Sequence, residues 1–162
     1  MMGRRSRVVV AGLGSEYRRD DGAGPLVAET AVTRAGWGTV IGPLSDPLDL
    51  LGEWDDADLA VIVDAVHSGR VPGTLTTVEL VDGPGGELPG GYRGASSTHG
   101  IGLAGVLRLA RAVDQAPRRV FVVGIEGDDF SQGTGLSPAV QAAVPAAVSC
   151  VVDLIAGGTP CA

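Results

Sequence analysis

Apolar positions come in short blocks along the chain, and the form of these blocks predicts strands that alternate with helices. Runs rich in Val, Ile and Leu occupy residues 8–13, 59–63 and 120–125. Such runs are typical of strands that are buried on both faces, as in parallel sheets. Residues 39–41 and 74–80, which are rich in Thr and Val, predict two further strands. The 74–80 segment follows the 59–63 run with no room for a helix, so we expect these two strands to be antiparallel.

Apolar residues at helical spacing follow most of the predicted strands. Pro25 opens an apolar stripe that closes near Gly36, and Asp46-Pro47 predicts the cap of a second helix. We expect a further helix from about Thr98 to Val113, and a last one from Ser137-Pro138 to the glycines 157–158. Strands that alternate with helices in this way predict an α/β fold.

The composition is that of a globular protein. Of the 162 residues, 44% are hydrophobic and 19% are charged, which predicts a buried core and a single domain over residues 1–162. The net charge of -7 argues against nucleic-acid binding, because phosphate contacts require clustered Lys and Arg. The apolar run 8–13 is too short for a membrane span, so we expect no membrane partner. Cys150 and Cys161 form no C-x-x-C pair, which argues against a zinc ribbon and fits a cytoplasmic location.

Asp21, Asp64 and His99 are the candidate functional residues, because each lies just past a predicted strand or at the start of a predicted helix. They are 43 and then 35 residues apart, so they come from three different loops. In an open α/β sheet, ligands bind in the crevice beyond the carboxyl ends of the strands. Two carboxylates and an imidazole are potential metal ligands, and the spacing therefore suggests one site built from three loops.

Each of these residues also has a simpler interpretation. Asp20 and Asp21 fit helix caps, because short carboxylates accept hydrogen bonds from backbone N–H groups there. Asp64 fits a solvated turn, and His99 fits a hydrogen-bonded cap. His67 is a second imidazole close to Asp64 in sequence. We rank it below His99, because its position in a turn bears no fixed relation to the other loops.

Two glycine-rich segments need separate interpretations. The turn 12–22 is not a dinucleotide-binding loop, because Tyr17 stands where the third glycine is needed and two carboxylates precede the helix. The Walker pattern is missing as well. Residues 81–97 hold six glycines and two prolines with no hydrophobic period. A loop of this length in a compact domain usually has a function, and contact with substrate is the hypothesis for it.

Four strings follow one another across nearly the whole chain, with the segment 46–51 between them. They are Gly12-x-Gly14-x6-Asp21-Gly22-x-Gly24, Val63-Asp64-Ala65-Val66-x-Ser68-Gly69, Ser97-Thr98-His99-Gly100-Ile101-Gly102-Leu103, and Gly124-Ile125-Glu126-Gly127 with Gly135-Leu136-Ser137-Pro138. In their order the strings closely resemble those of the hydrogenase maturation protease family. Each string alone is only moderately specific, and their order carries the resemblance.

Members of that family are cytoplasmic endopeptidases. They remove a short C-terminal extension from the precursor of the large subunit of nickel–iron hydrogenases after nickel insertion, and they thereby activate the hydrogenase. The resemblance implies the same peptide-bond hydrolysis here. It also implies a twisted, mostly parallel mixed sheet flanked by helices. With the five strands predicted above, this corresponds to a three-layer α/β/α fold.

The resemblance implies roles for three residues. Asp21, Asp64 and His99 match the family's metal-binding and catalytic positions. The resemblance further implies that the protein holds no permanent metal cofactor, and that nickel carried by the precursor docks on these three side chains as the recognition element. The protein would then be a metal-associated, aspartyl-type endopeptidase. Its partner would be the nickel-loaded precursor, with no part for nucleic acid or a membrane.

The chain departs from the commoner family pattern at two positions. Ser15 stands where asparagine often follows the second glycine, and serine can still form hydrogen bonds. Gly42-Pro43 stands where many members have an acidic residue before glycine, so a carboxylate is missing. Asp46 is close enough in sequence to replace it, although helix capping explains Asp46 more simply. Glu16 and Asp20 are candidates for a general base, for which surface carboxylates are the simpler description.

Two other functions stay open. The protein could be a nickel-dependent chaperone that binds the precursor without cutting it. It could also be a metallo-aminopeptidase or amidohydrolase with its own bound metal. The lack of an H-E-x-x-H motif, and a site with only three candidate ligands, argue against this last function.

Overall fold

The computed structural model describes residues 5–81 and 102–158. Its strands are β1 (Val8–Leu13), β2 (Thr39–Leu44), β3 (Leu59–Val66), β4 (Leu75–Glu79) and β5 (Arg119–Glu126). Its α-helices are α1 (Ala23–Ala35), α2 (Leu103–Ala112) and α3 (Pro138–Ile155). Two single turns of 3-10 helix, η1 (Arg19–Gly22) and η2 (Pro47–Leu50), precede α1 and follow β2. His99, all but the first residue of the loop 81–97 and the start of the helix expected from Thr98 lie outside the described residues.

The strands form one five-stranded sheet in the order β2-β1-β3-β5-β4. The first four in this order are parallel to one another, and β4 is antiparallel to β5. The predicted mixed, mostly parallel sheet is therefore confirmed. The strand β4 also runs opposite to β3, as expected, but it pairs with β5, which lies between the two. The strands β1, β3 and β5 lie inside the sheet, which explains why their sequences are apolar on both faces.

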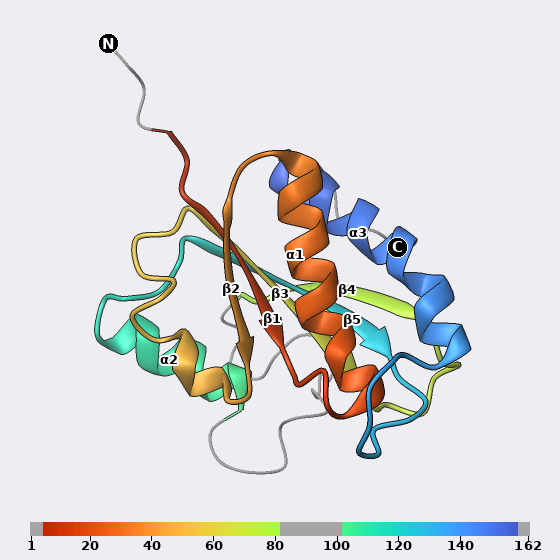
Figure 1. Ribbon diagram of the computed structural model, residues 1–162. Coiled ribbons are helices and arrows are strands. Elements are labelled where there is room, and N and C mark those ends of the chain that lie inside the picture. The colour runs from red at the N-terminus through yellow and green to blue at the C-terminus, as the bar shows by residue number, and fades with distance from the viewer. Residues whose placement is uncertain (1–4, 82–101, 159–162) are drawn as a thin grey trace.

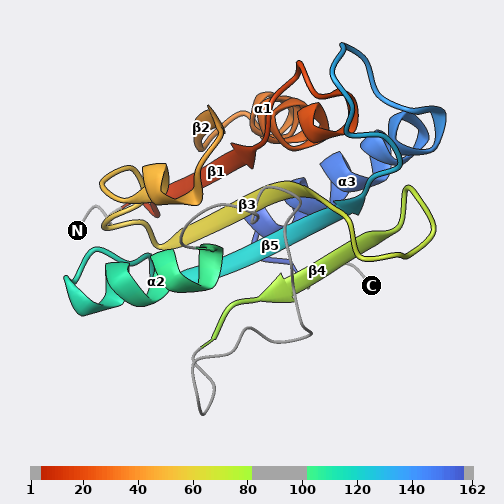
Figure 2. The ribbon, with the colours of Figure 1, turned by 90° about the horizontal axis from the view of Figure 1, so that it is seen from below.

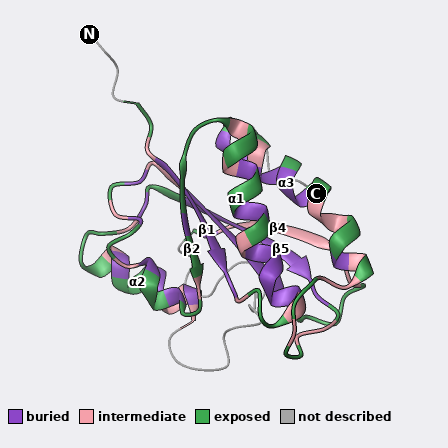
Figure 3. Ribbon diagram, in the orientation of Figure 1, coloured by how far each residue is buried: buried purple, intermediate pink, exposed green. Residues whose placement is uncertain are grey.

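Helices cover both faces of the sheet, as Figures 1 and 2 show. On one face, α1 and α3 pack against alternate strand residues such as Val61 and Val123. On the other face, α2 and η2 pack against the intervening residues, such as Ile62 and Val122. The central strands are buried along nearly their whole length, whereas the helices are buried only on the side that meets the sheet (Figure 3). The predicted three-layer α/β/α fold is confirmed.

Three element boundaries show how local sequence acts. The helix α1 ends before Gly36, whose φ of 78° is a left-handed conformation that favours glycine. Asp46 caps η2 as predicted, since its Oδ1 accepts a hydrogen bond from the N–H of Leu48 at 2.9 Å. The expected helix after Asp46 is wrong in length, because only one 3-10 turn forms there. The strand β3 continues to Val66, beyond the predicted end at residue 63, because β5 pairs with it that far.

The helix α3 is long and apolar enough to cross a membrane by length and composition, and it is the one such helix in the described part of the chain. Its apolar face is occupied within the fold, however. Residues including Val148, Val151 and Leu154 are buried with the sheet strands in one core cluster. Core helices of globular proteins pass the same test, and α3 is such a helix here.

Candidate functional site

The carboxyl ends of β1 and β3 lie close beneath the start of α1, and glycines make this possible. A Cβ atom on Gly24 would lie 2.5 Å from the carbonyl oxygens of both Leu13, at the end of β1, and Val63, in the carboxyl-terminal half of β3. A Cβ atom on Gly14, which has a φ of 120°, would collide with the backbone of Asp21. The spaced glycines of the first string therefore bring η1 and α1 directly onto the edge of the sheet.

Asp21 is buried at this edge, with 3% of its surface exposed. Its Oδ2 accepts a hydrogen bond from the N–H of Ser15 at 2.9 Å and lies 4.0 Å from Nη1 of Arg18. Its Oδ1 is buried and has no hydrogen-bond partner among the described residues. Burial raises the pKa of the Asp21 carboxyl, and the Ser15 hydrogen bond and the Arg18 charge only partly oppose this. The helix-cap interpretation is wrong for Asp21, because α1 has no side-chain cap.

Asp64 lies inside β3 rather than after it, with 1% of its surface exposed. The interpretation as a solvated turn residue is therefore wrong. Asp64 pairs with Gly124 of β5, and the preceding Val63 pairs with Gly12 of β1. Asp64 is thus next to the point where β1 continues toward Gly14 and Asp21, and η1 is in contact with β3. Both carboxylates belong to the carboxyl edge of the sheet, as expected for a ligand-binding crevice.

His99, the third predicted residue, lies outside the described residues. The described chain resumes at Gly102, the N-cap of α2, on the face of the sheet that α2 covers. Within residues 5–81 and 102–158, no group of three or more His, Cys, Asp or Glu side chains is arranged to hold a metal ion. The three-residue metal site therefore stays a prediction.

Asp20, next to Asp21, is a buried carboxylate that binds a distant segment. Its Oδ2 accepts hydrogen bonds from the N–H groups of Asp128 and Asp129, each at 2.8 Å, and from the Ser137 hydroxyl at 2.8 Å. Its Oδ1 accepts the N–H of Ser137 at 2.7 Å. Burial alone raises the pKa of Asp20, but the hydrogen bonds from Asp129, Ser137 and Asp128 outweigh it and hold this pKa below its usual value. Asp20 is neither a surface carboxylate nor a helix cap.

Glu126 is a second buried carboxylate, at the end of β5, with 2% of its surface exposed. Its Oε1 accepts hydrogen bonds from the N–H groups of Ser68 at 2.8 Å and Gly69 at 3.0 Å. Its Oε2 accepts the Ser68 hydroxyl at 2.8 Å. Glu126 therefore binds the turn that leaves β3 just beyond Asp64.

Comparisons with known proteins identify the family of the chain. The family model for hydrogenase maturation proteases matches residues 39–154. This chain belongs to the hydrogenase maturation protease family. It is 26% identical to hydrogenase 2 maturation protease of Escherichia coli, over 90% of this chain and 88% of that protein. It is 30% identical to the hydrogenase expression/formation protein HupD of Rhodobacter capsulatus, over 88% of this chain and 68% of that protein.

A solved structure extends the likeness to three dimensions. The NiFe hydrogenase maturation protease HybD of Thermococcus kodakarensis matches with a TM-score of 0.71 and 25% identity, over 91% of this chain and 98% of that one. The protein is thus a hydrolase of peptide bonds with the α/β fold of its family. The family resemblance found in the sequence is confirmed.

The structure shows the local contacts of Ser15 and Asp46, the residues concerned by the two departures from the family pattern. Ser15 keeps a local role, because its hydroxyl accepts a hydrogen bond from the N–H of Tyr17 at 3.2 Å and its own N–H binds Asp21. Asp46 does not replace the carboxylate that is missing at Gly42-Pro43, because its side chain caps η2. Glu16 is exposed, in agreement with a surface carboxylate.

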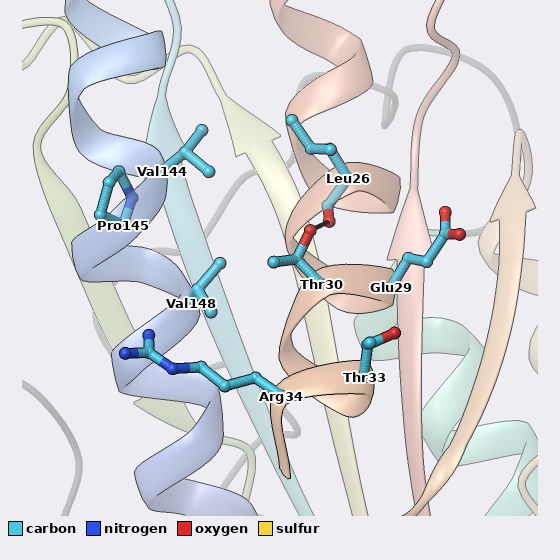
Figure 4. A pocket seen from close by; sticks show the side chains of 8 residues that line it. All are labelled: Leu26, Glu29, Thr30, Thr33, Arg34, Val144, Pro145 and Val148. Atoms are coloured by element: carbon cyan, nitrogen blue, oxygen red, sulfur yellow. Dashed lines mark hydrogen bonds between the residues drawn. The ribbon is translucent and has the colours of Figure 1, made fainter. Parts of the chain in front are cut away.

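Two pockets lie beside α1 among the described residues. A cavity of about 700 Å³ lies between α1 and α3, where Leu26, Thr30 and Val148 are among the side chains that line it (Figure 4). A second cavity, of about 460 Å³, extends from α1 to η1 and is lined by Glu16 and Gly22 among others. The second one reaches the backbone next to Asp21, and neither is lined by Asp21 or Asp64 side chains.

Sequence reasoning missed the roles of Asp20, Glu126 and Ser68. All three stand inside the strings that carried the family resemblance, yet only the fold shows that the first and the second string each contain a partner of the fourth. The ring of His67 also meets the ring of Phe130 edge-on, with centroids 5.9 Å apart. The expectation that His67 bears no fixed relation to other loops is therefore wrong. The available signal was a charged residue, Glu126, directly after the apolar run 120–125.

Proposed function

We propose that the protein removes the C-terminal extension from the precursor of a nickel–iron hydrogenase large subunit after nickel has been inserted. In this proposal the nickel belongs to the substrate. It docks on Asp21, Asp64 and His99, and the docked metal holds the scissile peptide bond beside the site. The protein acts as an activating protease of the hydrogenase in the cytoplasm.

The buried carboxylate of Asp21 is the observation that most supports this proposal. The carboxylate of Asp21 is buried, and its Oδ1 has no hydrogen-bond partner among the described residues. Burial also raises the pKa of the Asp21 carboxyl. A buried carboxylate without full compensation is costly, and a metal cation relieves that cost by binding the oxygen. Asp64 adds a second buried carboxylate at the same edge of the sheet.

The chemistry of the three residues agrees with transient capture of a metal that already has other ligands. Two carboxylates and one imidazole leave coordination positions for groups of the precursor. Nickel accepts imidazole and oxygen ligands, so these side chains can complete its coordination without a permanent cage. Docking in this way orients the peptide, and orientation of a reacting bond alone accelerates its hydrolysis.

The test is the mass of the precursor after incubation with the protein, with the precursor either loaded with nickel or free of nickel. We expect loss of the C-terminal extension only from the loaded form. Equal cleavage of both forms would contradict nickel recognition but not protease activity. A tight complex with unchanged precursor mass would instead support a non-cleaving chaperone. A stoichiometric metal in the purified protein would support a peptidase with its own metal.

A further inference from the structure

We propose that Glu126 is a positioning residue of this protease, which fixes Asp64 through the turn that follows it. The inference rests on the proposed function in one respect, since it takes Asp64 to be a site residue. Nothing in the sequence strings assigns this part to Glu126.

Glu126 and Asp64 share one face of the sheet. Asp64 pairs with Gly124, and Val66 pairs with Glu126, in the parallel register of β3 and β5. Because side chains alternate between the faces of a strand, Asp64 and Glu126 project on the same side, with one residue pair between them. That side is the one covered by α2, since Ile62 and Val122 belong to the core cluster beneath α2.

Every polar group of Glu126 binds the segment that leaves β3. The carboxylate accepts hydrogen bonds from Ser68 and Gly69, as described above. The backbone N–H of Glu126 donates to the carbonyl oxygen of Thr74 at 2.9 Å, and its own carbonyl oxygen accepts the N–H of Gly73 at 2.8 Å. One residue therefore holds the turn between β3 and β4 at both of its ends.

A turn held in this way restrains the last residues of β3. Asp64 is only two residues before Val66, whose carbonyl oxygen accepts the N–H of Gly127 at 2.9 Å. Without the Glu126 carboxylate, the N–H groups of Ser68 and Gly69 would lose their partner, and the end of β3 would be held to β5 by the backbone ladder without this side-chain restraint. A shift of about 1 Å in a positioned group can reduce catalysis by about a hundredfold.

The geometry makes a sharp distinction between two substitutions. Both backbone N–H groups donate to Oε1, whereas among the described residues Oε2 accepts a hydrogen bond only from the Ser68 hydroxyl, which can accept as well as donate. A glutamine with its oxygen at the Oε1 position keeps all three hydrogen bonds. We therefore expect Glu126→Gln to rescue what Glu126→Ala loses, although the charge is gone.

A matched control is available at the amino-terminal end of β3. Asp58 precedes β3, and its Oδ2 accepts a hydrogen bond from the N–H of Arg7 at 2.7 Å. Asp58→Ala thus removes a carboxylate that binds a backbone N–H at the other end of the same strand. It should lower the thermal stability without changing the cleavage rate of the folded protein.

The experiment measures kcat/KM for cleavage of nickel-loaded precursor at a temperature where each variant is folded by circular dichroism. We expect Glu126→Ala to lower kcat/KM by about tenfold to a hundredfold, and Glu126→Gln and Asp58→Ala to change it by less than about twofold. In an Asp64→Asn background, adding Glu126→Ala should cost little more, because the two residues act through one element.

Three outcomes would overturn the inference. Equal losses in Glu126→Ala and Asp58→Ala would make Glu126 merely structural. A Glu126→Gln variant as slow as Glu126→Ala would show that the charge matters rather than the hydrogen bonds. Losses that multiply in the double variant would show that Glu126 does not act through Asp64. Full activity of Asp64→Asn alone would instead contradict the proposed function, so the two failures are distinguishable.

Discussion

Replacing Asp20 by asparagine should destabilise the protein far more than its near-identical shape suggests. The carboxylate accepts four hydrogen bonds, three at Oδ2 and one at Oδ1, and three of the four donors are backbone N–H groups. An asparagine presents one oxygen and one NH2 group. Whichever way the amide is turned, its NH2 group faces at least one backbone N–H donor. In the better orientation the N–H of Ser137 loses its acceptor, and the NH2 group is pressed against it.

The magnitude follows from these losses. Hydrogen bonds to a charged group contribute about 1.5–3 kcal/mol each, against about 0.5–1.5 kcal/mol for neutral ones, and a buried unsatisfied donor costs about 1–3 kcal/mol. Three weakened bonds and one lost bond give about 3–5 kcal/mol for Asp20→Asn at neutral pH. In a chain of this size that corresponds to a fall in Tm on the order of 10 °C.

Thermal and urea denaturation measure this change, with Asp46→Asn as the control. Asp46 also accepts a backbone N–H, but at an exposed 3-10 helix cap where asparagine serves as well as aspartate. The folded-state pKa of Asp20 is lowered, so its stabilising contribution is present above the unfolded-state pKa and is lost as pH falls through the folded-state pKa. The difference between wild type and Asp20→Asn should therefore shrink in acid. A Tm for Asp20→Asn within about 2 °C of wild type at pH 7 would refute the reasoning.

Three further predictions follow from the same edge of the sheet. Asp21→Asn should leave stability unchanged or raise it by up to about 1 kcal/mol in urea denaturation, because it removes a buried charge that is only partly compensated; a clear loss of stability would contradict this. The folded-state pKa of Asp21 is raised, so the destabilising effect of its carboxylate should be absent below the unfolded-state pKa and develop as pH rises through the folded-state pKa. The stability advantage of Asp21→Asn over wild type should therefore grow with pH. A difference that does not change with pH would count against this. Gly24→Ala should cost about 3 kcal/mol, because its Cβ atom would meet two carbonyl oxygens at 2.5 Å, and a neutral effect in denaturation would show that α1 is not held so closely.

The fold could be predicted from the sequence largely because its central strands are buried on both faces. Apolar runs such as 59–63 and 120–125 identified β3 and β5 without ambiguity, and Gly36 and Ser137-Pro138 marked helix ends by local backbone chemistry. The pairing of β4 could not be predicted, because strand order depends on which neighbour its face packs against. The length of the segment after Asp46 was also missed, because a good cap does not by itself make a long helix.

The candidate site could be predicted only in part. The positions of Asp21 and Asp64 at one edge follow from the rule that loops after parallel strands meet there. The burial of Asp21 does not follow, because it depends on how closely η1 and α1 approach the strands across Gly14 and Gly24. The hydrogen-bond partners of Asp20 are 108 to 117 residues away in sequence. Those of Glu126 are 57 to 58 residues away. Contacts over such separations have no local signal in a single sequence.

We propose above that nickel in the precursor docks on Asp21, Asp64 and His99. The most direct measurement is the rate at which nickel-loaded precursor loses its C-terminal extension, followed by mass, with Asp21→Asn, Asp64→Asn and His99→Ala. Asp153→Asn, at an exposed position of α3, is the control. We predict that each of the three site variants cleaves at least about a hundredfold more slowly while the control cleaves at the wild-type rate. Wild-type cleavage by any of the three site variants would contradict the claim.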